Sequence, residues 1–158
     1  KQIKMLNLNI IALTELTRLF LSDMVKRGSG KIMNVASTAA FQAGPLMAVY
    51  YASKAYVLSF SEAINEEVRD KGITVTALCP GPTVSGFQEA AGIGENKLFS
   101  GRKLPDSRRV AEFGYSAMMK GKAVAIEGCL NKILAFSGRF LPRSIVVKTV
   151  KRIQEKRK

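Results

Sequence analysis

Asn34-Val35-Ala36-Ser37 and Tyr50-Tyr51-Ala52-Ser53-Lys54 are two short segments from which the organisation of the whole chain can be worked out. The apolar run that ends at Ser37 predicts a buried parallel strand over residues 31–37. The second segment lies in a helical pattern over residues 46–70, and because Tyr50 and Lys54 are four residues apart they share a face of that helix. Open α/β sheets bind ligands at the carboxyl ends of their strands, so we expect Ser37, Tyr50 and Lys54 to meet there.

These three side chains together are suited to proton transfer. A free tyrosine has a pKa of about 10 and is a poor proton donor or acceptor near neutral pH. The ammonium group of Lys54 would favour the phenolate and lower the pKa of Tyr50, toward the range in which general acid–base catalysis is most effective. The hydroxyl of Ser37 would hold a carbonyl or alcohol oxygen within reach of the phenol.

The order and spacing of Ser37, Tyr50 and Lys54 resemble the catalytic signature of the short-chain dehydrogenase/reductase family. Asn9, in Leu8-Asn9-Ile10, lies where that family has its fourth catalytic residue, and Pro80-Gly81-Pro82-Thr83 resembles the Pro-Gly motif that follows one of its strands. The resemblance covers nearly the whole chain. It implies an α/β fold with a doubly wound parallel sheet of the Rossmann type. It also implies an NAD(P)-dependent oxidoreductase that transfers hydride between nicotinamide and a carbonyl or alcohol substrate.

The resemblance assigns a role to each matched side chain. Tyr50 would be the general acid in reduction and the general base in oxidation, and Lys54 would lower its pKa and hold the nicotinamide ribose. Ser37 would orient the substrate oxygen, with Thr38 as an alternative that is less well spaced from Tyr50. Asn9 would distort its helix locally and support proton supply through a water molecule that links Lys54 to solvent.

A cofactor site and a substrate site are implied in the same way. The expected cofactor is NAD(P)(H), with NADP(H) preferred, and its expected contacts are Tyr50, Lys54, Pro80, Gly81, Thr83 and Ser85. The missing side chain of Gly81 would let a flat ring approach the backbone. The expected substrate contacts are Ser37, Ala39, Phe41 and Phe87. Residues 86–106 would be a loop that closes over the substrate, in which Leu98 and Phe99 either form an apolar wall or pack in the core.

The chain opens at Lys1 directly in a helical pattern, with apolar residues at three- and four-residue steps over residues 3–27. The resembled family carries a glycine-rich loop after its first strand, and no G-x-x-x-G-x-G lies near the start here. We therefore expect residues 1–158 to be a single domain, the carboxyl-terminal part of a longer, N-terminally incomplete Rossmann-type fold. About three βα units, roughly 90 residues, would precede it. Strand 31–37 would then have an unpaired apolar edge.

The remaining elements follow from shorter patterns. Residues 73–79 are apolar and β-branched and predict a strand. Asp106-Ser107 predicts the N-cap of a helix that runs through Met119. Residues 123–126 predict a short buried strand, and residues 131–140 and 144–156 predict two helices.

Composition excludes several kinds of site. The sequence has no histidine, which excludes Ser-His-Asp and Cys-His catalysis and argues against a metal centre. Its two cysteines form no disulfide framework, and Cys79 in an apolar strand is expected to be a buried thiol in a reducing, cytoplasmic compartment. No apolar run approaches the ~20 residues of a membrane span.

Positive charge is concentrated at the end of the chain. The net charge is +13, and residues 120–158 carry eleven Lys or Arg and two acids, or 11 − 2 = +9 of it. The expected basic terminal helix over residues 143–158 also has a partial apolar stripe. It would be a solvated helix, or it would lie peripherally on an anionic membrane surface. Nucleic-acid binding is the weakest interpretation, and we expect no nucleic-acid partner.

By resemblance, the helices over 3–27 and 46–70 would form a homodimer or homotetramer interface. The segments around Ser37 and Pro80 look most like bacterial general-purpose reductases related to ketoacyl and steroid reductases. One alternative is a non-catalytic relative that acts as a binding or membrane-associated scaffold module. Another is a hydrolase that uses Ser37 with Lys54 as base, although the G-x-S-x-G element of a nucleophile elbow is missing.

Overall fold

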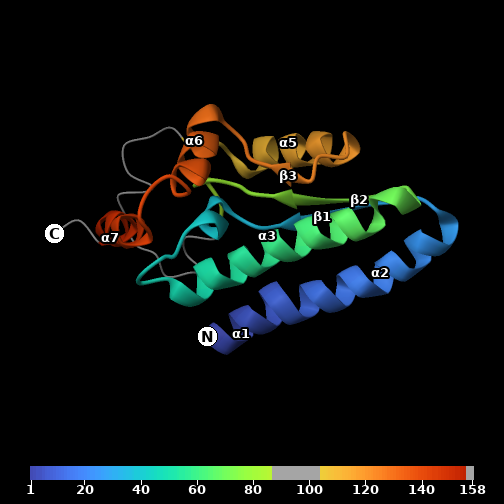
Figure 1. Ribbon diagram of the computed structural model, residues 1–158, viewed down its shortest axis with the longest axis horizontal. Coiled ribbons are helices and arrows are strands. Elements are labelled where there is room, and N and C mark those ends of the chain that lie inside the picture. The colour runs from blue at the N-terminus through green and yellow to red at the C-terminus, as the bar shows by residue number, and fades with distance from the viewer. Residues whose placement is uncertain (87–103, 156–158) are drawn as a thin grey trace.

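The computed structural model describes residues 1–86 and 104–155. The elements in chain order are α1 (Gln2–Leu6), η1 (Asn7–Ala12), α2 (Leu13–Arg27), β1 (Gly30–Val35), η2 (Thr38–Phe41), α3 (Ala48–Val68), η3 (Arg69–Lys71), β2 (Ile73–Leu78), α5 (Ser107–Met119), β3 (Val124–Ala125), α6 (Cys129–Ser137) and α7 (Arg143–Gln154). The three strands form one parallel sheet in the order β1-β2-β3. Figure 1 shows α2 and α3 side by side on one side of the sheet and α5 on the other. The expected α/β arrangement is therefore present.

The alternation of side chains along the strands separates two layers of the core. On the α5 side, Leu78 of β2 packs with Val110 and Ala117. On the opposite side, Ile73 and Val75 of β2 pack against the α2 and α3 layer. Parallel strands covered on both faces read as continuous apolar runs, which is why β2 is apolar along most of its length.

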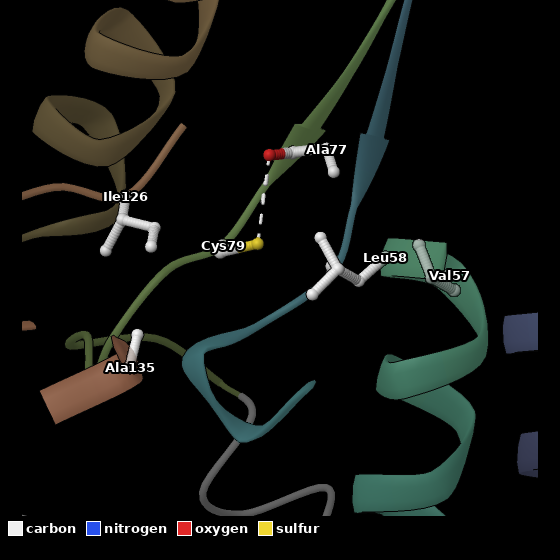
Figure 2. Packing of buried hydrophobic residues seen from close by; sticks show 7 residues of the cluster. Val57, Leu58, Ala77, Cys79, Ile126 and Ala135 are labelled. Carbon is white, nitrogen blue, oxygen red and sulfur yellow. Dashed lines mark hydrogen bonds between the residues drawn. The ribbon is translucent and has the colours of Figure 1, made fainter. Parts of the chain in front are cut away.

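A third cluster lies toward the carboxyl ends of the strands and joins α3, β2 and α6. Figure 2 shows Cys79 among Val57, Ala77, Ile126 and Ala135, with a hydrogen bond of 3.8 Å from its Sγ to the Ala77 carbonyl. Cys79 is fully buried and unpaired, as the sequence predicted. Burial raises the pKa of its thiol to about 12, so it stays protonated near neutral pH.

Two element boundaries differ from the sequence prediction in ways that affect the site. The helix expected over residues 3–27 is interrupted by the π-helical turn η1, between α1 and α2. The strand expected over 31–37 ends at Val35, so Ser37 lies two residues beyond β1. Ser37 has an extended backbone and caps the 3-10 turn η2 instead. The two terminal helices also differ from the expected ranges of 131–140 and 144–156, since α6 begins at Cys129 and α7 ends at Gln154.

The outer edge of β1 is open. Within the described residues β1 pairs only with β2, which confirms the expected unpaired edge. A groove of about 490 Å³ runs along this edge between β1 and the helical segments η1 and α2, and Asn9, Val35 and Lys54 are among its lining residues. The candidate catalytic lysine therefore faces the same groove as the π-helical turn.

Two left-handed glycines close the turns at the amino ends of the strands. Gly28 (φ 69°) ends α2 just before β1, and Gly72 (φ 73°) ends η3 just before β2. A Cβ on Gly72 would lie 2.3 Å from the Gly28 carbonyl oxygen, so the two turns pack backbone to backbone. This packing holds the starts of β1 and β2 together, at the end of the sheet opposite Ser37.

None of the helices in residues 1–86 or 104–155 has the length and apolar character needed to cross a lipid bilayer.

Replacing Gly44 with alanine is expected to destabilise the loop that leads into α3. A Cβ at residue 44 would lie 2.2 Å from the ring of Tyr51, which is buried and cannot move aside freely. Overpacking of this kind costs about 1–3 kcal/mol, which urea denaturation would measure as a lower midpoint with an unchanged slope. Gly86→Ala is the control, because nothing lies within 4 Å of a Cβ there. Equal stability of the two variants would contradict the packing described here.

Candidate active site

Ser37 is positioned by the two chain segments that continue beyond β1 and β2. The Ala36 amide donates to the Leu78 carbonyl (2.7 Å) and the Thr38 amide donates to the Pro80 carbonyl (2.9 Å), so these segments remain side by side past the last strand residues. The Ser37 hydroxyl accepts from the Ala39 amide at 3.1 Å. Its rotation is therefore limited by the backbone of the turn that it caps.

Tyr50 and Lys54 project from the same side of α3, as their spacing predicted. The Tyr50 phenol is hydrogen-bonded to the Ser37 side chain. The Lys54 Nζ lies 5.9 Å from the centre of the Tyr50 ring and donates to the Val35 carbonyl at 2.8 Å. The three side chains thus meet at the carboxyl edge of the sheet, with Lys54 linking α3 to the end of β1.

The pKa of Tyr50 is raised in the folded chain, whereas the sequence predicted that Lys54 would lower it. Burial raises the pKa of Tyr50 above that of free tyrosine, and the hydrogen bond with Ser37 counteracts this only in part. Burial also lowers the pKa of Lys54. The physical reason is that both groups lose water on folding, while the ammonium is directed at a backbone carbonyl. In the chain alone, Tyr50 is therefore a proton donor near neutral pH.

Asn9 lies in the π-helical turn η1, so the local helix distortion that the resemblance implied is present. Its side-chain amide donates to the Ser53 hydroxyl at 3.0 Å, and Ser53 in turn donates to the Tyr50 carbonyl at 2.8 Å. Ser53 is fully buried. It connects the distorted turn to the backbone of the candidate catalytic tyrosine, and single π-helical turns are frequent at functional sites.

Sequence reasoning missed Ser53 although it stands between Tyr50 and Lys54. The only signal was a small polar residue on an otherwise apolar helix face, which is common and has many causes. Its partner Asn9 is 44 residues away in the sequence. Helical periodicity gives no information on such a distant partner.

The loop after β2 holds the residues expected to contact a cofactor. The Thr83 hydroxyl donates to the Gly81 carbonyl at 2.9 Å, which closes a tight turn next to Pro80. A Cβ on Gly81 would lie 2.6 Å from the side-chain amide of Asn131. This corrects the explanation for the glycine, because the side that lacks a side chain is filled by Asn131 rather than left open for a flat ring. Ser85 is exposed, beyond the point where Val84 bridges to Asp106.

The residues expected to contact the substrate are more buried than the sequence predicted. Ala39 is buried in the turn η2. Phe41 is half-buried and its ring centre lies 5.9 Å from that of Phe136 on α6, so it joins η2 to the carboxyl-terminal helices. Ser37 lies at the site as described above. Phe87, Leu98 and Phe99 lie outside the described residues.

Comparison with known proteins gives one family and one fold. The sequence model of a family described as short chain dehydrogenase matches residues 2–96. The very-long-chain 3-oxoacyl-CoA reductase of Rattus norvegicus is 40% identical over 77 residues, which are 49% of this chain and 25% of that protein. The ketoacyl reductase HetN of Nostoc is 41% identical over 75 residues, 48% of this chain and 26% of that protein.

Solved structures share the same architecture. A short-chain dehydrogenase from Sphingobium yanoikuyae in complex with NADPH superposes with a TM-score of 0.72 at 24% sequence identity. The match covers 97% of this chain and 56% of that one. The chain thus spans about a quarter of the length of the curated relatives it matches and about half of this solved structure.

Proposed function

The chain belongs to the short chain dehydrogenase family, and from that membership we propose that it carries the proton-transfer site of an NAD(P)-dependent oxidoreductase acting on a carbonyl or alcohol. The observation that carries the proposal is the Tyr50 phenol, hydrogen-bonded to Ser37 and flanked by the Lys54 ammonium at the carboxyl edge of a parallel sheet. Residues 1–158 would form one domain of Rossmann type within that enzyme.

Proton transfer at this site would proceed through Tyr50. A dinucleotide, when bound, would supply a hydride for the carbonyl carbon, and the matching proton would have to reach the carbonyl oxygen. Ser37 would hold that oxygen by a hydrogen bond while Tyr50 donates its phenolic proton, so that C=O becomes CH–OH. In the reverse direction the phenolate would take the alcohol proton. The raised pKa of Tyr50 keeps the donor protonated near neutral pH, which suits the reducing direction.

The residues at the site fit the ribose side of a dinucleotide. An ammonium has three N–H donors, and the Val35 carbonyl takes one from Lys54. The others can bind ribose hydroxyls, and Tyr50 lies on the same face of α3. Pro80 and Thr83 would border the nicotinamide, although Asn131 fills the side of Gly81 expected to be open. Asn9, on the same groove as Lys54, would support its reprotonation.

We propose a ketoacyl group as the substrate class and NADP(H) as the preferred cofactor. The proposal draws on the 3-oxoacyl-CoA reductase and ketoacyl reductase relatives and on the NADPH held by the Sphingobium yanoikuyae neighbour. The test is the fall in absorbance of NADPH, and in parallel of NADH, when the purified protein is mixed with 3-ketoacyl thioesters and simple ketones. Binding of the cofactor without any turnover would support the scaffold alternative instead.

The hydrolase alternative is not favoured by the geometry. A lysine that activates Ser37 would have to accept the proton of the Ser37 hydroxyl. The Lys54 ammonium instead donates to the Val35 carbonyl, and the Ser37 side chain is hydrogen-bonded to Tyr50.

The proposed homodimer or homotetramer would use the exposed apolar side chains of α2, such as Leu19 and Phe20. Light scattering of the purified protein would test it.

Ser53→Ala is expected to lower turnover about tenfold, because the link between Asn9 and the Tyr50 carbonyl is lost and catalytic geometry is sensitive to small displacements. Ser61→Ala is a closely matched control on the same helix. Ser61 is also fully buried, donates to the Val57 carbonyl and accepts from an asparagine amide, that of Asn34, at 3.0 Å.

Both serine variants are expected to lose about 1–3 kcal/mol of stability, since each leaves an asparagine amide without its partner. Only Ser53→Ala should lower kcat, with KM for the cofactor nearly unchanged. Ser53→Thr restores a hydroxyl and is expected to recover part of the rate. If the two alanine variants lose the same activity, Ser53 has only a structural role.

A further inference from the structure

The carboxyl-terminal part of the structure exposes several large apolar side chains. On α6, Ala135 is buried in the core, while Leu130 and Ile133 on the opposite side are 51% and 65% exposed. Phe140, just after the helix, is 86% exposed, the highest value for a large apolar side chain in the described residues. Leu141 and Ile145 continue this exposure into α7. Large apolar side chains exposed together in one segment of the chain are candidates for an interaction site.

Basic side chains are interleaved with this apolar surface. Residues 128–155 contain six Lys or Arg and a single acid, Glu155, a net of 6 − 1 = +5. Lys132, Arg139 and Arg143 lie among the exposed apolar residues, and Arg139 stacks over the Phe136 ring at 5.2 Å. Each ion pair found within the described ranges involves residues elsewhere in the chain, so these cations carry uncompensated charge.

The segment is fixed to the body of the protein. Phe136 packs against Phe41 of η2, and Gln154 at the end of α7 is buried and donates to the Tyr51 hydroxyl at 2.5 Å. Figure 1 shows α6 and α7 at the end of the molecule where the carboxyl ends of the strands lie. The exposed apolar residues are therefore held outward by anchored helices.

We propose that this basic apolar surface, comprising Leu130, Lys132, Ile133, Arg139, Phe140, Leu141, Arg143 and Ile145, lies on an anionic lipid bilayer. The apolar side chains would enter the boundary between headgroups and acyl chains, and the cations would contact the anionic headgroups. A second copy of this chain would place +5 against +5, which opposes association. Nucleic acid would satisfy the charges but leave Phe140 and Ile133 without a suitable environment.

The test is flotation of the purified full chain with phosphatidylcholine vesicles, with and without phosphatidylglycerol. Binding is expected only with the anionic lipid and should fall as salt is added. Ile133→Ser/Phe140→Ser and Arg139→Glu/Arg143→Glu should each reduce the bound fraction by roughly fivefold or more, because one removes the apolar contact and the other the charge. The matched control is Tyr115→Ser/Lys120→Glu, which changes an exposed residue of α5 and the exposed C-cap of that helix and should bind like the wild type.

Circular dichroism would show that each variant is folded, and light scattering would report its mass. Absence of binding to anionic vesicles, or equal binding by all variants, would overturn the proposal. A mass that falls to the monomer in Ile133→Ser/Phe140→Ser would identify a second copy as the occupant and would also overturn it. Preferential binding of RNA over vesicles would do the same. None of these results depends on the proposed enzymatic activity.

Discussion

Replacing Tyr50 with phenylalanine is expected to lower turnover by roughly 10²–10⁴-fold, the range that a positioned general acid or base contributes. The variant keeps the ring, whose centre lies 6.0 Å from that of Tyr51 in an edge-to-face arrangement, so the local packing of α3 should survive. What is lost is the phenolic proton and the hydrogen bond with Ser37. Cofactor affinity, measured by fluorescence titration, should stay within a few-fold of the wild type.

Tyr51→Phe is the matched control for this prediction. It removes a phenol from the adjacent position of the same helix, but the Tyr51 hydroxyl accepts a hydrogen bond from Gln154 of α7. It should cost about 1 kcal/mol of stability, since one hydrogen bond is lost, and leave turnover nearly unchanged. Turnover that persists in Tyr50→Phe would favour the scaffold alternative over the enzyme.

The direction of the Tyr50 pKa shift predicts how the two reaction directions depend on pH. Because burial raises this pKa, the phenol stays protonated through neutral pH and the reduction rate should be flat there. Alcohol oxidation needs the phenolate, so its rate should rise as pH increases toward the pKa of Tyr50. Rates of both directions measured over the same pH range would check this; an oxidation rate that falls with rising pH would contradict it.

Replacing Lys54 with methionine is expected to lower kcat/KM by roughly 10²-fold or more, as expected for the loss of a preorganised charge at a reacting centre. Methionine fills a similar volume but removes the ammonium 5.9 Å from the Tyr50 ring and its bond to the Val35 carbonyl. The pKa of Tyr50 should rise further, because the nearby positive charge that favours the phenolate is gone. KM for the cofactor should also increase.

The pH profile separates these effects of Lys54. In Lys54→Met, the rate of alcohol oxidation should begin to increase at a higher pH than in the wild type. Lys54→Arg keeps the charge but changes the donor geometry, so its rate should increase over the same pH range as in the wild type but remain lower. If the rate of Lys54→Met increases over the wild-type pH range, the ammonium binds the cofactor without changing the pKa of Tyr50.

Local patterns along the chain were sufficient for much of the fold. The four-residue spacing of Tyr50 and Lys54 placed both on one face of α3, and the carboxylate of Asp106 caps α5 by accepting from the Arg109 amide at 2.7 Å, as predicted. Such features depend on helix period and on backbone groups within one turn, which the neighbouring residues fix. The order of motifs was likewise enough to indicate the family.

Contacts between residues that are far apart in the sequence could be seen only in the tertiary structure. The link from Asn9 through Ser53 to Tyr50 spans 44 residues, that from Tyr51 to Gln154 spans 103, and Asn131 fills the space beside Gly81. The raised pKa of Tyr50 also depends on the folded molecule, because it follows from the water that the phenol loses when α3 packs against the sheet. Periodicity tells which face of a helix is buried, whereas its partner depends on how all the elements pack.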